Sequence, residues 1–101
     1  MDPLHHVAIQ VDDIERAVKW YRERFSVKVR YADDSWAIIS FANVDLALVR
    51  PHQHPPHIAV ERSDAAQFGA LTAHRDGTHS TYIEDLDGNF IEMLTVPAKE
   101  R

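Results

Sequence analysis

Residues 6–11 read His-Val-Ala-Ile-Gln-Val, and residues 57–62 echo them as His-Ile-Ala-Val-Glu-Arg. This repeat decides the fold, because self-similarity along a chain indicates that one structural unit occurs twice. In both stretches apolar side chains alternate with other residues, the period of a half-buried strand. Each half of the chain later ends in an apolar strand followed by a proline, Pro51 or Pro97. The repeat predicts two modules, residues 1–51 and 56–101, joined by a proline-containing linker.

The first module carries a complete set of signals for a strand, a helix and three more strands. Asp12 is a plausible N-cap, and Glu15 three residues later completes a capping box. The residues behind it form one apolar helical stripe at positions i, i+3, i+4 and i+7: Ile14, Ala17, Val18 and Tyr21. Residues 27–31, 36–41 and 44–49 are rich in apolar and β-branched side chains, and they predict three further strands.

The second module repeats the pattern with weaker signals. Residues 63–74 predict a helix with a modest apolar face, and Gly77 follows as its C-cap. Two strands then cover residues 81–83 and 90–96. The turn at residues 85–89 contains an Asp-Gly pair, which suits a hairpin because glycine accepts a positive φ.

The two modules together predict an α+β fold. We expect two βαβββ-type modules that pair into an open, cupped mixed sheet with helices on the outside. A length of 101 residues fits a single domain over residues 1–101. So short a chain buries limited surface on its own, which favours a homodimer.

Composition excludes several classes of partner. The net charge is −5 and no basic run occurs, so we expect no binding to nucleic acid. No apolar stretch approaches the roughly 20 residues of a membrane span, and no secretory signal is evident, so we expect a cytoplasmic protein. The chain contains no cysteine, so a metal would have to be held by histidine nitrogens and carboxylate oxygens.

Three residues are placed to form such a metal site. Alternate residues of a strand share a face, so His6 and His57 both lie on the non-core face of the first strand of their module. Glu92, on the last strand, can join them from the same side. Two imidazoles and one carboxylate suit a divalent transition metal (iron, manganese, nickel, cobalt or zinc) and leave positions open for a substrate.

Further candidates surround these three. Gln10 and Glu61 each follow a histidine by four residues on the same face, so each can serve as a base, as a support for a ligand imidazole, or as a polar rim residue. Trp36 and Tyr82 are candidate pocket residues, although aromatic side chains in a small domain first of all fill the core. His74 lies near the end of the predicted second helix, where we expect it to be solvated.

The chain resembles the vicinal oxygen chelate superfamily, which includes glyoxalases, bleomycin-resistance proteins and extradiol dioxygenases. Residues 4–13 look like its first strand and helix cap, residues 17–25 like the helix that follows, and residues 85–93 like its closing hairpin. The resemblance implies that His6, His57 and Glu92 are the metal ligands. Aligning the module ends on their prolines puts Leu46 opposite Glu92, so a fourth side-chain ligand is not evident.

The resemblance also implies a range of activities on small molecules. The first is that of a metal-dependent lyase or isomerase of the glyoxalase kind, with Glu92 or Glu61 near the substrate proton. The second is that of an iron(II) ring-cleaving dioxygenase with the same three ligands. The third is metal-free sequestration of a ligand, as in bleomycin-resistance proteins, although such members commonly lack the metal residues.

Overall fold

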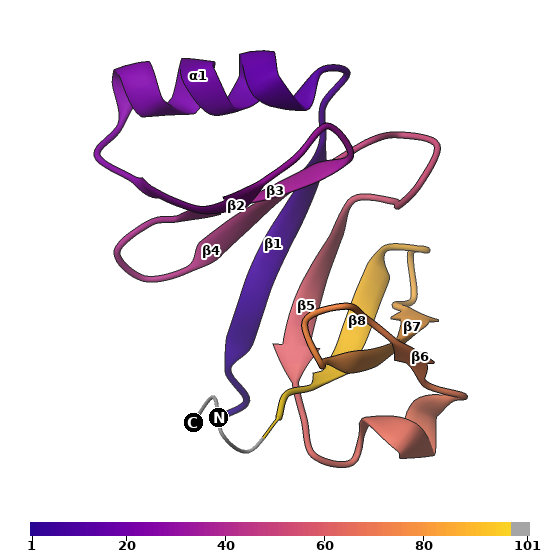
Figure 1. Ribbon diagram of the computed structural model, residues 1–101. Helices are drawn as coiled ribbons and strands as arrows, with labels where there is room; N and C mark the ends of the chain where they lie inside the picture. Colours follow the sequence, from indigo (N-terminus) through magenta and orange to yellow (C-terminus); the bar gives the residue numbers. More distant parts are fainter. Residues whose placement is uncertain (98–101) are drawn as a thin grey trace. The chain divides into compact units, whose positions relative to one another are not determined.

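The structure is a computed structural model that describes residues 1–97, and the chain divides into two units (Figure 1). Residues 6–56 make up the first unit, and residues 1–5 with the chain from His57 onward make up the second. Within residues 1–97 each unit contains four strands. Their orders are β2-β3-β4-β1 in the first unit and β5-β8-β7-β6 in the second.

The two units share one topology. In each, the first strand runs parallel to the last, β1 beside β4 and β5 beside β8, and every other neighbouring pair is antiparallel. The prediction of an α+β fold with mixed sheets is therefore confirmed.

The first unit follows the sequence prediction closely. Its elements are β1 (Leu4–Gln10, with His6 onward in this unit), α1 (Ile14–Arg24), β2 (Lys28–Ala32), β3 (Trp36–Ser40) and β4 (Asp45–Val49). The N-cap is Asp13, not the predicted Asp12, because the Asp13 side chain accepts a hydrogen bond from the Arg16 backbone N–H.

The core of this unit lies between α1 and the sheet. Ile14 and Val18 of the helix pack against Ala37, Ile39 and Leu48 of the strands, all of them buried. Ile9 and Val11 join this cluster, whereas Ala8 belongs to a separate cluster with Ala47 and Val49. The predicted alternation of the first strand is thus confirmed, and the face of β1 that holds His6 points away from the helix.

The second unit departs from the prediction. Its elements are β5 (His57–Glu61), the 3-10 helix η1 (Ala65–Phe68), β6 (Thr72–Ala73), β7 (His79–Glu84) and β8 (Phe90–Thr95). The predicted helix over residues 63–74 is wrong, because the helical turn ends at an extended Gly69 and residues 72–73 pair with β7 instead. Gly77, with φ +88°, does not cap a helix but makes the turn between β6 and β7.

The closing hairpin is confirmed. Asp85 accepts hydrogen bonds from the backbone N–H groups of Asp87 and Asn89 and from the Asn89 side chain. Gly88 adopts φ +83°, a conformation that glycine accepts without strain. The turn fixes the register of β7 against β8, so that Tyr82 lies opposite Glu92.

None of the helices within residues 1–97 combines the length and the apolar composition of a membrane span.

Candidate metal site

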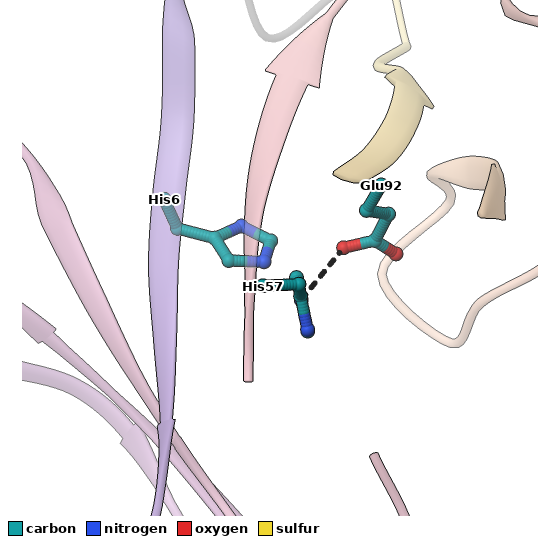
Figure 2. A group of neighbouring side chains, drawn as sticks. All are labelled: His6, His57 and Glu92. Atoms are coloured by element: carbon teal, nitrogen blue, oxygen red, sulfur yellow. Dashed lines mark ion pairs between the residues drawn. The ribbon is translucent and has the colours of Figure 1, made fainter. Parts of the chain in front are cut away.

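The centre of the candidate site is a buried histidine–glutamate pair within the second unit. His57 opens β5 and Glu92 lies in β8, where the parallel register sets Ala59 against Glu92. The distance between His57 Nε2 and Glu92 Oε1 is 3.3 Å (Figure 2). His57 is 7% exposed and Glu92 is 6% exposed, so this contact is almost entirely shielded from water.

The other oxygen of the Glu92 carboxylate has a partner that sequence analysis missed. The Ser80 hydroxyl, from β7, donates a hydrogen bond of 2.7 Å to Glu92 Oε2. His74 Nε2 in turn lies 2.6 Å from Ser80 Oγ and 3.6 Å from Glu92 Oε2. His74 was expected to be solvated, but its side chain is only 32% exposed because the turn between β6 and β7 brings it against Ser80.

Tyr82, from β7, lies beside this pair. Its ring meets the His57 ring edge to face at a centroid distance of 5.1 Å and the Phe90 ring at 6.1 Å. Burial and the nearby Glu92 charge raise the pKa of the Tyr82 phenol above its usual value of 10.0. The hydroxyl therefore keeps its proton at neutral pH and can act as a hydrogen-bond donor.

Glu61 lies farther along β5 than the centre of the site. It pairs with Leu94, two residues along the parallel ladder from the Ala59–Glu92 pair, and it is partly exposed. Its backbone N–H donates to the Pro3 carbonyl. The alternation along β5 therefore places Glu61 on the same face of the sheet as His57.

The remaining candidates belong to the first unit. His6, labelled in Figure 2, lies in β1 opposite Asp45 of β4. The Gln10 side chain donates a 2.9 Å hydrogen bond to the His54 carbonyl and so ties the linker to β1. Trp36 shares a ladder row with Val49, and its ring lies 4.6 Å from the Tyr31 ring.

The register corrects the position assigned to a fourth ligand. In the second unit, Ala59 lies two residues after His57 and pairs with Glu92. In the first unit, Ala8 lies two residues after His6 and pairs with Ala47. The residue equivalent to Glu92 is thus Ala47, and not Leu46, which packs against the helix-side core. The alignment on Pro51 and Pro97 is shifted by one residue, because β8 has one more residue between Glu92 and its end than β4 has between Ala47 and its end. An alanine cannot coordinate a metal, so the first unit offers no carboxylate at this position.

Comparison with known proteins identifies the family. The model of the glyoxalase/bleomycin resistance protein/dioxygenase superfamily matches residues 3–73. The chain belongs to this superfamily. No curated protein matches the chain.

Solved structures confirm the superfamily fold. A superfamily member from Vibrio splendidus 12B01 is 12% identical with a TM-score of 0.72, and the match covers 94% of this chain and 99% of that one. A hypothetical protein from Bacillus halodurans C-125 is 14% identical with a TM-score of 0.76 and 95% coverage of both chains. A variant of methylmalonyl-CoA epimerase from Streptomyces coelicolor is 18% identical with a TM-score of 0.74, covering 95% of this chain and 98% of the epimerase. At these identities the likeness concerns the fold.

Proposed function

We propose that this superfamily member is an enzyme that acts on a small molecule through a divalent transition metal held by His6, His57 and Glu92. Each of the three residues offers one ligand atom. Imidazole nitrogens and carboxylate oxygens suit iron, manganese, nickel, cobalt and zinc, and three protein ligands leave positions for substrate oxygens. The superfamily assignment, over residues 3–73, supports this proposal.

The observation that carries the proposal is the burial of the His57–Glu92 pair. Removing a carboxylate from water costs several kcal/mol unless opposite charge and hydrogen bonds compensate it. The Ser80 hydrogen bond compensates one oxygen of Glu92, while the other is directed at the His57 imidazole. A divalent cation bound by His57 and Glu92 would neutralise the carboxylate. It would therefore offset the cost of burying these two groups.

The surrounding residues suit chemistry on a substrate with two adjacent oxygens. When bound, the metal supplies Lewis-acid polarisation of those oxygens. The neutral Tyr82 phenol can donate a hydrogen bond to the substrate, and Gln10 and Trp36 are the further contacts that we propose. Glu92 or Glu61 would take or return a proton at substrate carbon, as in a lyase or isomerase reaction.

The deciding experiment is the metal content of the untagged protein beside a His57→Ala variant. We expect about one transition metal per chain in the parent and none in the variant, measured by inductively coupled plasma mass spectrometry. A His52→Ala variant is the matched control, because His52 is an exposed linker histidine. A variant that keeps its metal when His57 is removed would overturn the ligand assignment.

The same experiment separates the alternatives. Iron as the bound metal, with dioxygen consumption in the presence of catechol-like substrates, would favour the ring-cleaving dioxygenase. Absence of metal in the parent, even after reconstitution, would leave ligand sequestration of the bleomycin-resistance kind as the better account.

We also propose that the protein works as a homodimer, on the ground that one chain of 11.6 kDa has a limited core. Light scattering coupled to size-exclusion chromatography tests this directly. We expect twice the mass of a single chain, and a single-chain mass at micromolar concentration would contradict the proposal.

A further inference from the structure

Four polar side chains of the second unit form one continuous chain of contacts. His57 Nε2 lies 3.3 Å from Glu92 Oε1, Ser80 Oγ donates to Glu92 Oε2 at 2.7 Å, and His74 Nε2 lies 2.6 Å from Ser80 Oγ. The proposed function uses His57 and Glu92 but gives no role to Ser80 or His74. Ser80 is nevertheless only 2% exposed, so its hydroxyl is committed to these partners and not to water.

The direction of these hydrogen bonds follows from the chemistry of the groups. An ionised carboxylate only accepts, so the single proton of the Ser80 hydroxyl goes to Glu92. The Ser80 hydroxyl oxygen can then only accept a hydrogen bond from His74. His74 Nε2 is therefore protonated and donates to Ser80 Oγ over the 2.6 Å distance. His74 thereby fixes the rotation of the hydroxyl, and the hydroxyl fixes the plane of the carboxylate.

We propose that Ser80 is a positioning residue for the metal ligand Glu92, and that His74 orients the Ser80 hydroxyl. This inference rests on the proposed function. With Oε2 engaged by Ser80, Oε1 is the oxygen directed toward His57, so Glu92 would bind the metal through this oxygen alone. Partners that orient a ligand from behind typically change metal affinity by about 10–100-fold when they are removed.

A merely structural role makes a different prediction. If Ser80 only satisfied a buried carboxylate, its loss would lower stability without altering the surroundings of His57, which Ser80 reaches only through Glu92. Two measurements therefore distinguish the roles: the affinity for Co²⁺ by titration calorimetry, and the imidazole ¹⁵N signals of His57 in the metal-free protein.

The test uses three variants of the full chain. Ser80→Ala removes the hydroxyl, Ser80→Thr restores it, and His74→Ala removes the orienting group at a partly exposed position. Ser35→Ala is the matched control, because it deletes a similar hydroxyl-to-carboxylate bond, of 2.7 Å to Asp33, in the other unit.

We expect Ser80→Ala to weaken Co²⁺ binding about 10–100-fold and to shift the His57 imidazole signals of the metal-free protein. His74→Ala should act in the same direction, Ser80→Thr should restore both properties, and Ser35→Ala should change neither. If the parent binds Co²⁺ and the Ser80→Ala variant binds it with an affinity within twofold of the parent's, the inference is overturned. If Ser80→Ala does not fold, His74→Ala decides by the same criteria.

Failure of the proposed function itself gives a distinct result. If the parent binds no Co²⁺, the metal site is refuted, and the His57 signals of the metal-free protein then decide on positioning alone. A shift in Ser80→Ala would support the positioning of Glu92 by Ser80, and unchanged signals would overturn it.

Discussion

At the scale of single residues, the buried Glu92 carboxylate lies between His57 and Ser80. A buried charge of this kind depends on each partner, because removing one leaves part of the desolvation cost uncompensated. The same carboxylate is the only anionic group among the three proposed ligands. Its charge is therefore the property that a substitution can test without changing its shape.

Glu92→Gln replaces the charge by an amide of nearly the same shape. Because the amide is a much weaker metal ligand than a carboxylate, we expect the affinity for Co²⁺ to fall by about 100-fold or more, against the 10–100-fold typical of supporting residues. Titration calorimetry measures this, with Glu23→Gln on the exposed face of α1 as control. Unchanged affinity in Glu92→Gln would show that Glu92 is not a ligand.

Asp85 provides a prediction on pH dependence. The Asn89 side chain, and then the backbone N–H groups of Asn89 and Asp87, lower the pKa of Asp85 below its usual value of 3.8. A depressed pKa contributes stability that is present above the unfolded-state pKa and is lost as the pH falls through the folded-state pKa.

We therefore expect Asp85→Ala to unfold at a temperature several degrees below that of the parent at pH 7, and the difference to shrink as the pH falls below 3.8. Thermal unfolding followed by circular dichroism between pH 2 and pH 7 measures it. A difference that grows toward low pH would contradict the assigned hydrogen bonds.

At the scale of elements, the two units differ in what covers the sheet. The first unit has α1, with 11 residues and a fully buried Ile14, whereas the second, as far as residue 97, has only the four residues of η1. As a result Ile58 of β5 is 38% exposed. The same repeated strand pattern thus leads to different burial in the two units.

This contrast gives a matched pair of variants. Ile14→Ala should lower the free energy of unfolding by about 2–5 kcal/mol, because it empties a fully buried position. Ile58→Ala deletes the same atoms from a partly exposed position, where we expect a loss of about 1 kcal/mol or less. Urea unfolding measures both losses, and an equal loss in the two variants would show that Ile58 is covered in solution.

At the scale of the whole molecule, the repeated topology gives each unit a histidine at the start of its first strand, but only the second unit carries a carboxylate two residues along the paired strand. In the first unit Ala47 stands at that position. The first unit therefore adds no carboxylate to the three ligands that we propose, His6, His57 and Glu92.

Metal binding should stabilise the folded chain, because the proposed ligands are not preformed in the unfolded state. A ligand that binds only the folded state at 100 times its Kd adds about 2.7 kcal/mol to the free energy of unfolding. We expect added Co²⁺ or Zn²⁺ to raise Tm by about 10 °C or more in the parent, measured by calorimetry. His57→Ala should show no such rise, and an equal rise in both would point to metal bound elsewhere.

The amino-acid sequence by itself determined the α+β class, the two-fold repeat, the strands of the first unit and the hairpin at residues 85–89. These follow from local physics: alternation of side chains along a strand, a helical apolar stripe, and a glycine where the turn requires a positive φ. It also singled out His57 and Glu92, which the structure brings into contact within the second unit.

Only the tertiary structure decided the rest. The hairpin pairs β7 antiparallel with β8, which places Ser80 two residues from Tyr82, the partner of Glu92, and the β6–β7 turn brings His74 against Ser80. No local pattern marks Ser80 or His74. The failed helix at residues 63–74 has the same origin, since pairing of Thr72–Ala73 with β7 prevailed over a weak helical signal. The strand register, likewise, made Ala47 and not Leu46 the equivalent of Glu92. Contacts between residues distant in the sequence depend on how the strands pair. Strand pairing is decided by tertiary context, so a local sequence pattern does not predict it.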